Sequence, residues 1–313
     1  MRRLKKILKW TGIVLASFIG VIAVIVMMRQ NIKSDRPYPL IKASADTAII
    51  TKGKHFVISA AHCADCHSKS NADSMINLGL DPLLTGGVLF DLPVGKIYSK
   101  NITSDAETGI GKYTDGEIAR ALRYGVHPDG TVVYDFMPFH NMADDDLTAV
   151  ISYLRTLKPV RNEVPKHSLN TIGKVVKAFL IKPVGPSGDV ASSIKADTSV
   201  AYGRYLANNI ANCSGCHTKR AITGEYVGEP FGGSEMIEGD IHFLTPNLTP
   251  DSSGRLFTWS QKNFMDRFRA GKLVPHSPMP WNSFGRMTDN ELKAIYAYLK
   301  SLKPVKTASI VEK

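Results

Sequence analysis

The chain contains two copies of one domain-sized sequence pattern. The segment CADCH at residues 63–67 recurs as CSGCH at residues 213–217, 150 residues later. The segment DDDLTAVISYLRTLKPV at residues 144–160 recurs as DNELKAIYAYLKSLKPV at residues 289–305. This period is far above the roughly 20–50 residues of solenoid repeats. The sequence therefore predicts one domain that is duplicated rather than an array of small units.

Matched positions outside these segments help to set the limits of the copies. Gly53 precedes the first C-x-x-C-H motif as Gly203 precedes the second. We place the two domains at residues 46–165 and 196–306. The remaining segments are a basic flank with an apolar helix (1–30), a linker (31–45), a second linker with an amphipathic helix (166–195) and a tail (307–313).

Both copies are expected to be helical. Apolar residues recur at the spacing of one helix face at Leu147, Val150, Ile151, Leu154 and Leu157, and again at Leu292, Ile295, Tyr296, Leu299 and Leu302. The segments TDGE at residues 114–117 and TDNE at residues 288–291 fit capping boxes that begin helices. Alternation of useful strand length does not occur in the sequence, so the predicted fold class is all-α.

The start of the chain predicts a membrane helix. Residues 10–28 carry no charge, and at about 1.5 Å per residue they span roughly the 30 Å hydrocarbon core of a bilayer. The preceding segment MRRLKK is basic and is expected to stay in the cytoplasm. A cleaved signal peptide is the alternative, but the apolar run is long and ends in VMMRQN, without a small-residue cleavage site. We therefore favour a retained transmembrane helix.

The formal net charge of +11 does not indicate a nucleic-acid partner. Residues 1–33 hold seven basic residues and no acidic one, which leaves 32 basic and 28 acidic residues in the rest of the chain, a balance of +4. A basic stripe interleaved with aromatic residues is also lacking in the sequence. We therefore expect a membrane, and no nucleic acid, among the partners.

All four cysteines belong to the two C-x-x-C-H motifs, which a zinc site, a redox dithiol or a covalent haem would each explain. A structural zinc site needs four ligands, and each motif supplies three. A thioredoxin-like dithiol expects a βαβ context, and this chain is predicted to be helical. In a c-type haem site the two thiols bond the porphyrin, and the histidine that follows binds iron. We therefore predict two covalent c haems, attached through Cys63, Cys66, Cys213 and Cys216, with His67 and His217 as iron ligands.

A second axial ligand is expected from a methionine. Two pairs occupy matched positions, Met137 with Met279 and Met142 with Met287. The first pair lies in a loop, each member followed by proline, and sulfur can reach iron from such a loop. The second pair begins the last helix, where a core contact is the ordinary interpretation. We favour the first pair; the second pair, a histidine and an open iron site remain alternatives.

Several polar residues also match between the copies. They are Asn101, Thr103 and Arg123 in the first copy and Asn247, Thr249 and Arg269 in the second. Each Asn-x-Thr pair is expected either to form a turn through its side chains or to contact a haem propionate. The arginines are expected either to pair with propionates or to lie on a solvated helix face. Two histidines without such a match, His55 and His62, are expected at the surface.

The linker between the copies contains an amphipathic stripe. Its apolar residues are Ile172, Val175, Val176, Phe179 and Leu180. We expect a helix that packs across the two domains; docking on a membrane surface or on a partner is the alternative.

Taken together, the motifs resemble class I cytochrome c. The segments at residues 101–126, 134–139 and 287–304 are similar to the multihaem cytochrome c subunits of membrane-associated bacterial alcohol, aldehyde and sugar-acid dehydrogenases. The resemblance implies that the methionine of each M-P-x motif, Met137 or Met279, is the distal iron ligand. Many of those subunits carry three haems and a cleaved leader, whereas this sequence has two motifs and an apolar N-terminal helix.

The expected function is electron transfer. Iron held by histidine and methionine has no free position for a substrate, so we expect an electron carrier and not an enzyme. Electrons are expected to pass between a dehydrogenase and quinone or a terminal oxidase. The expected location is the bacterial inner membrane, with the N-terminus in the cytoplasm and the haem domains in the periplasm. A dihaem cytochrome c peroxidase is the alternative, and it needs one haem that opens for peroxide.

Overall fold

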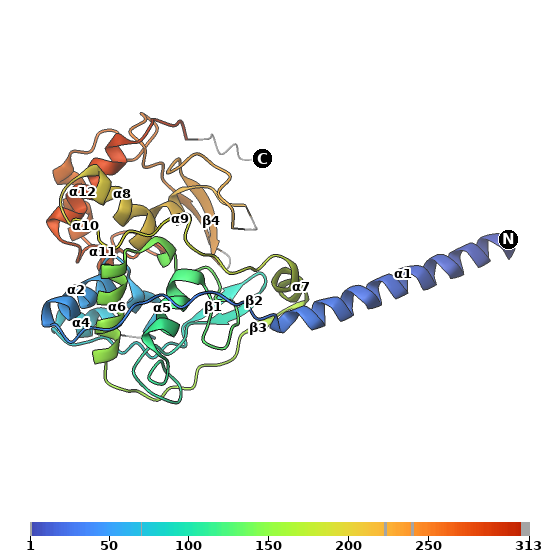
Figure 1. Ribbon diagram of the computed structural model, residues 1–313. Helices are drawn as coiled ribbons and strands as arrows, with labels where there is room; N and C mark the ends of the chain where they lie inside the picture. Colours follow the sequence, from blue (N-terminus) through green and yellow to red (C-terminus); the bar gives the residue numbers. More distant parts are fainter. Residues whose placement is uncertain (1, 70, 222–223, 239–240, 308–313) are drawn as a thin grey trace.

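The structure is a computed structural model that describes residues 2–69, 71–221, 224–238 and 241–307. Its elements form two domains that lie against each other, and one long helix projects away from them (Figure 1). This helix, α1 (Arg2–Met28), ends in a short 3₁₀ turn, η1 (Arg29–Asn31). A segment without regular structure then leads into the first domain.

The first domain runs from α2 to α6. Its elements are α2 (Thr47–Ile58), α3 (Cys63–His67), α4 (Ala72–Asn77), β1 (Leu89–Leu92), β2 (Gly95–Tyr98), α5 (Asp115–Tyr124), the 3₁₀ turn η2 (Phe139–Asn141) and α6 (Asp144–Thr156). The linker that follows contains β3 (Ser168–Leu169) and α7 (Thr171–Phe179).

The second domain repeats this order of elements, except that its described residues include no counterpart of α4. Its elements are α8 (Val200–Tyr205), the π-helical turn η3 (Leu206–Ile210), α9 (Cys213–His217), β4 (Ser234–Glu238), β5 (Ile241–Thr245), α10 (Gln261–Arg269), α11 (Trp281–Phe284) and α12 (Asp289–Ser301). In both domains the first and the last helices pack together, and the C-x-x-C-H motif forms a helix of its own.

Both predicted capping boxes are confirmed. The Thr114 hydroxyl accepts the N–H of Glu117, and the Glu117 carboxylate accepts the N–H of Thr114 at the start of α5. Thr288 and Glu291 make the same exchange at the start of α12. These reciprocal bonds satisfy main-chain donors that have no partner inside the helix. The sequence thus determines where these helices begin.

The first helix of each domain crosses the last helix at a glycine. A Cβ atom on Gly53 of α2 would lie 1.8 Å from the carbonyl oxygen of Ala149 in α6. A Cβ atom on Gly203 of α8 would lie 1.9 Å from the carbonyl oxygen of Ala294 in α12. The two backbones are therefore too close for any side chain, which is the physical reason for the matched glycines.

The all-α prediction is corrected by a β-hairpin in each domain. Strand β1 pairs antiparallel with β2, and β3 from the linker pairs with the other edge of β2. Strand β4 pairs antiparallel with β5. Each strand has only two to five residues, which is too short for a clear alternation of apolar and polar residues. The described chain is nevertheless mostly helical.

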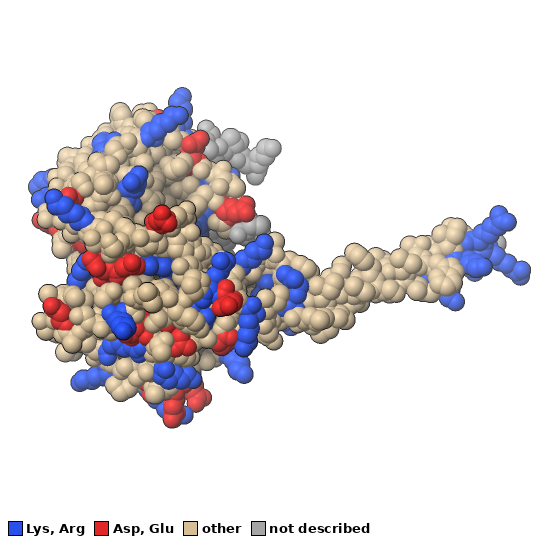
Figure 2. Space-filling model, in the orientation of Figure 1, with Lys and Arg blue, Asp and Glu red and all other residues tan. Residues whose placement is uncertain are grey.

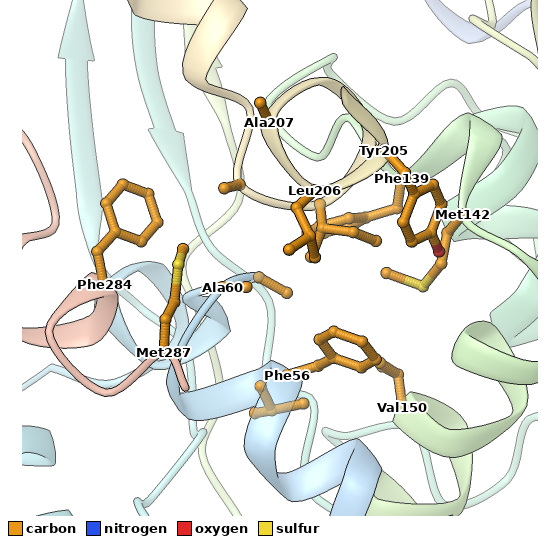
Figure 3. Packing of buried hydrophobic residues seen from close by; sticks show 14 of the residues in the cluster. Phe56, Ala60, Phe139, Met142, Val150, Tyr205, Leu206, Ala207, Phe284 and Met287 are labelled. Carbon is orange, nitrogen blue, oxygen red and sulfur yellow. The ribbon is translucent and has the colours of Figure 1, made fainter. Parts of the chain in front are cut away.

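One hydrophobic core continues through both domains. It includes Phe56 and Val150 of the first domain and Leu206 and Phe284 of the second (Figure 3). Figure 3 shows Tyr205 of α8 beside residues of the first domain, and its hydroxyl accepts the N–H of Ala143 there at 3.0 Å. The two domains are therefore packed together through a shared core and are not joined by the linker alone.

Helix α1 is almost entirely exposed. The helix is long and apolar enough to cross a membrane, and only 6% of its most apolar 18-residue stretch is buried in the protein. Figure 2 shows Lys and Arg side chains at its free end and an uncharged surface along most of its length. These features agree with the predicted membrane helix.

We expected helix α7 to pack across the two domains, but the structure places it elsewhere. It contacts α1, η1 and β3, so it lies where α1 meets the rest of the protein (Figure 1).

Candidate functional site

Both C-x-x-C-H motifs enter their short helices through a left-handed residue. His62 has φ 37° and Asn212 has φ 51°, although neither is glycine. Such conformations are uncommon for residues with a side chain and favour sharp changes of direction. In the first domain, the bend places both thiols and the imidazole of His67 on the wall of one cavity.

The two motif histidines have the same hydrogen-bond partner. Nδ1 of His67 lies 2.7 Å from the carbonyl oxygen of Lys100, and Nδ1 of His217 lies 2.8 Å from that of Pro246. A carbonyl oxygen only accepts, so Nδ1 of each ring is the donor and Nε2 is the nitrogen with a free lone pair. Burial lowers the pKa of both histidines and thereby favours the neutral rings. This is the state in which imidazole binds a metal, with Nδ1–H oriented by a carbonyl.

The main chain behind each histidine is also fixed in the same way. The carbonyl oxygen of His67 accepts the N–H of Gly86 at 2.7 Å, and that of His217 accepts the N–H of Gly233 at 2.9 Å. Both glycines have positive φ, 66° and 92°. A Cβ atom on Gly86 would lie 2.3 Å from the main chain of Lys100, the partner of His67. Glycine therefore allows the loop to approach the histidine closely.

The four cysteines are free and partly buried. Burial raises the pKa of Cys63 to about 12 and that of Cys66 to about 11. Burial likewise raises the pKa of Cys213 to about 12. A reactive dithiol needs the opposite, a lowered pKa. Among the described residues, His, Cys, Asp and Glu side chains do not gather in threes that could hold a metal ion, so the zinc interpretation gains no support either.

The cavity of the first domain has a volume of about 830 Å³, which is in the range of cofactor sites. Cys63, Cys66 and His67 form part of its wall. Its apolar lining includes Ile97, Ile102, Ile110, Ile118, Leu122 and Phe139. Two thiols, one imidazole with free Nε2 and a broad apolar wall fit a covalently attached haem.

Met137 and Met142 both line this cavity, in different settings. Met142 is only 1% exposed and is packed among core residues that include Phe56 and Tyr205 (Figure 3). Met137 is partly buried at the edge of that core, in a loop before η2. In the second domain, Met279 is likewise partly buried and Met287 is 2% exposed. In each domain, one methionine thus lies in the core and the other lies in a loop at its edge.

The Asn-x-Thr segments form turns that hold the end of each domain. Asn101 Oδ1 accepts the N–H of Thr103 at 3.0 Å, and Asn101 Nδ2 donates to the carbonyl oxygen of Val160 at 2.9 Å. Asn247, Thr249 and Val305 repeat this arrangement in the second domain. These contacts favour the turn interpretation over the propionate interpretation for both segments.

The matched arginines also have protein partners. Arg123 donates to a carboxylate oxygen of Asp144 and, at 2.6 Å, to the carbonyl oxygen of Met142. Arg269 donates to Asp289 at 2.6 Å and to the carbonyl oxygen of Gly285. Each arginine therefore ties the middle helix to the start of the last helix, just beyond the methionine loop. Neither role had been inferred from the sequence.

Sequence reasoning also missed a basic group on the cavity wall. Lys100, His127 and His167 line the cavity. Burial lowers the pKa of all three, and the charge of Lys100 lowers the pKa of both histidines further. The pKa of His167 falls to about 4. Asp129 also lines the cavity, and its charge raises the pKa of Lys100 and of His127 against the effect of burial. Neither histidine has a counterpart in the second copy, so the repeat gave no signal for them.

His55 and His62 lie between the domains and not at the free surface as expected. His55 Nε2 lies 2.8 Å and 3.0 Å from the two carboxylate oxygens of Glu291 in α12. The ring of His62 meets that of Phe284 edge-on, with centroids 5.4 Å apart. Burial lowers the pKa of His62 to about 4. The sequence could not show that these histidines lie at a domain interface, because a partly polar interface and a solvent-exposed surface have similar residue patterns.

The family model for cytochrome c matches residues 50–158 and 200–303. These two ranges contain both C-x-x-C-H motifs and both last helices. The duplication seen in the sequence therefore corresponds to two matches to one family.

Several curated proteins are similar to the chain. The cytochrome c subunit of alcohol dehydrogenase (quinone) from Gluconobacter oxydans (strain 621H) is 30% identical over 287 residues, covering 83% of this chain and 56% of the relative. The fructose dehydrogenase cytochrome subunit of Gluconobacter japonicus is 28% identical, covering 91% and 59%. A diheme cytochrome c-type protein of Cereibacter sphaeroides is 25% identical, covering 77% and 82%. The chain thus spans less than two thirds of the length of the first two relatives.

Proposed function

The chain belongs to the cytochrome c family, and we propose that it is a membrane-anchored electron carrier with two covalently bound c haems. The observation that carries this proposal is the repeated geometry at His67 and His217. Each ring has Nδ1 bonded to a main-chain carbonyl oxygen and Nε2 left for a metal, directly after a cysteine pair. The diheme relative supports the number of haems.

In the proposed sites, thioether bonds attach one haem to the first cysteine pair and one to the second. Cys63 and Cys66 would hold the first haem, with His67 and Met137 binding its iron. Cys213 and Cys216 would hold the second, with His217 and Met279 binding its iron. Iron in such a site exchanges one electron between its ferric and ferrous states, and methionine ligation raises its potential. The bonds to Lys100 and Pro246 would orient the two histidines, and the apolar lining of the first cavity would limit the access of water to its iron.

For the propionates of the first haem, we favour the basic group at the cavity over the matched polar residues. Lys100, His127 and His167 line the cavity and can donate hydrogen bonds to a propionate, with one carboxylate, that of Asp129, beside them. By contrast, Asn101 and Arg123 are already bonded within the protein. The second copy lacks both histidines, so its propionates are expected to be more solvated.

The close packing of the domains supports electron transfer between the two haems. Electron tunnelling falls steeply with distance, and a shared core holds the two sites at one fixed separation. Because a histidine and a methionine would fill both free positions of each iron, the protein itself is expected to carry electrons and to perform no bond chemistry.

We further propose that α1 anchors the protein in the bacterial inner membrane, with the N-terminus in the cytoplasm and the haem domains in the periplasm. The basic flank of α1 and its uncharged length support this topology. A dehydrogenase subunit is the expected electron donor, and quinone or a terminal oxidase the expected acceptor. Relatives that are cytochrome subunits of alcohol and fructose dehydrogenases support the first part.

The test is to purify the full-length protein, count its haems and follow its spectrum. We expect two c-type haems per chain by the pyridine assay. The ferric spectrum should be low-spin and should not change when cyanide or peroxide is added. One haem per chain would contradict the duplicated site. A high-spin haem that turns over peroxide would instead favour the dihaem peroxidase.

A further inference from the structure

Helix α7 carries an apolar face that the described protein leaves uncovered. Ile172, Val175 and Phe179 are 66%, 40% and 43% exposed. Positions i, i+3 and i+7 share one side of a helix, so these three side chains form one stripe. The opposite side of α7 is buried: a Cβ atom on Gly173 would lie 1.9 Å from the carbonyl oxygen of Val94, and Ala178 is 4% exposed.

The position of α7 is set by the end of α1. Arg29 donates through Nε to the carbonyl oxygen of Ala178 at 2.7 Å, and its guanidinium lies 5.6 Å from the centroid of the Phe179 ring. Gln30 donates to the carbonyl oxygen of Lys174 at 2.9 Å. Figure 1 shows α7 beside α1 at the point where α1 reaches the domains. These contacts hold α7 against the end of α1.

The depth of α7 follows from the length of the apolar run. Residues 10–28 span about 28 Å at 1.5 Å per residue, close to the roughly 30 Å hydrocarbon core. Arg29 follows this run directly and must lie near the lipid headgroups when α1 crosses the bilayer. Phe179, which contacts Arg29, lies at the same level. An apolar stripe at this level meets lipid and not bulk water.

We propose that α7 lies in the interfacial layer of the bilayer that α1 spans, with Ile172, Val175 and Phe179 among the upper acyl chains. This inference rests on the proposed anchor. Lys182 lies just after the helix, and a lysine at this level attracts anionic headgroups. Lys174 and Lys177 instead line the cavity on the other side of the helix. Acidic residues are absent from residues 164–188 of the sequence, which is the charge pattern expected at such a surface.

The arrangement has a consequence for the first haem site. The cavity that contains Cys63 and His67 is also lined by Gln30, Lys174 and Lys177. An α7 that rests on the membrane therefore holds this side of the cavity next to the lipid surface. With α1 and α7 both engaged, the domains keep one orientation instead of swinging about a single tether.

The test uses full-length, haem-loaded protein in vesicles that contain phosphatidylcholine and phosphatidylglycerol. A nitroxide is attached to a cysteine introduced by Val175→Cys, and its collisions with lipid-soluble oxygen are compared with those of a water-soluble nickel chelate. Two reference labels are made in the same way: Phe18→Cys in α1, and Leu244→Cys, an apolar residue of β5 that is 63% exposed. We expect the label at Val175 to favour oxygen, as the label at Phe18 does, and the label at Leu244 to favour the nickel chelate.

The reference labels separate the two proposals. If the label at Phe18 favours oxygen but the label at Val175 favours the nickel chelate, α1 spans the membrane and the inference about α7 is overturned. If the label at Val175 is shielded from both reagents, a protein surface covers α7 and the inference is overturned as well. A label at Phe18 that favours the nickel chelate contradicts the anchor itself.

A second variant tests the same contact without a label. Val175→Asp places a charge in the proposed lipid-facing stripe, whereas Val200→Asp places one at a residue of α8 that is 45% exposed. We expect Val175→Asp to leave the protein in the vesicle fraction, because α1 remains, but to increase protease cleavage between residues 166 and 195. Equal cleavage of the two variants would contradict the proposal.

Discussion

The hydroxyl of Tyr205 donates a hydrogen bond to Oδ2 of Asp146 at 2.5 Å and so joins the first helix of the second domain to the last helix of the first. The residues that correspond to these two also bond each other, this time from the first helix of the first domain to the last helix of the second. His55, 150 residues before Tyr205, bonds the carboxylate of Glu291, which corresponds to Asp146. The duplicated domains therefore meet through two matched contacts, each between an aromatic side chain of one domain and a carboxylate of the other.

The first prediction concerns Tyr205. Tyr205→Phe removes a donor from the nearly buried Asp146 and the acceptor of the Ala143 N–H. Losing hydrogen bonds to buried groups, one of them a carboxylate, is expected to cost about 1–3 kcal/mol. Calorimetry of the haem-loaded protein should show a Tm several degrees lower.

Tyr296→Phe is the matched control. It removes a hydrogen bond of 2.7 Å to the carbonyl oxygen of Trp259 within the second domain. A bond to a neutral acceptor is worth less, about 0.5–1.5 kcal/mol. A larger loss from Tyr296→Phe than from Tyr205→Phe would show that the contact between the domains contributes little.

The second prediction is a pH dependence at Glu291. Burial opposes ionisation of this carboxyl, but hydrogen bonds from His55 and Thr288 outweigh it and lower its pKa below the ordinary 4.5. A lowered pKa in the folded state stabilises the fold above the unfolded-state pKa, and this gain is lost as pH falls through the folded-state value. The stability gap between wild type and Glu291→Gln should therefore be constant above the unfolded-state pKa and should shrink as pH falls below about 4.5.

Urea unfolding of both proteins between pH 7 and pH 3.5 measures this gap. Glu235→Gln serves as the control, because Glu235 is exposed and contacts His242 within a surface hairpin. A gap that stays constant with pH would mean that the charge of Glu291 does not stabilise the fold.

The third prediction concerns the helix crossings. Gly203→Ala would place a methyl group 1.9 Å from the carbonyl oxygen of Ala294, so the helices must separate. Overpacking of this kind costs about 1–3 kcal/mol or more. Gly53→Ala should act in the same way on the first domain. Gly188→Ala is the control, because nothing lies within 4 Å of the added carbon. Haem content should drop at one site in each crossing variant, and normal loading with unchanged Tm would contradict the tight crossing.

Features that depend on neighbouring residues could be predicted from the sequence, and contacts between distant residues could not. The capping boxes and the histidines after each cysteine pair depend on neighbouring residues, so local patterns revealed them. The bonds of His55 to Glu291 and of Tyr205 to Asp146 join residues that are far apart in the chain. A local pattern carries no information about such pairs. The hairpins were missed for a different reason, because short strands between two motifs have no clear alternation.

The matched positions were informative about conformation and less so about ligands. Asn101 and Asn247 are matched because each closes a turn onto the end of its domain. Lys100, His127 and His167 are not all repeated, yet they gather at the cavity. A comparison of the copies emphasises what both domains need in order to fold. It overlooks a feature that belongs to one site alone.

The last prediction concerns the distal ligand. Met137→Ala removes the proposed sulfur from the first haem iron. One of the two haems should then bind cyanide, and its reduction potential should fall, because methionine ligation raises the potential. Met279→Ala should have the same effect on the other haem. The measurements are a cyanide titration of the ferric protein and a spectroscopic redox titration.

The matched control is Met142→Leu, since Met142 also lines the cavity but is 1% exposed within the core. A swap of similar volume in a core usually costs less than about 1.5 kcal/mol, and both haems should keep their ligands. The opposite pattern, with cyanide binding in Met142→Leu and none in Met137→Ala, would move the iron ligand to the start of α6. Because Arg123 fixes the carbonyl of Met142 at 2.6 Å, that result would also require the loop before α6 to rearrange when haem is attached.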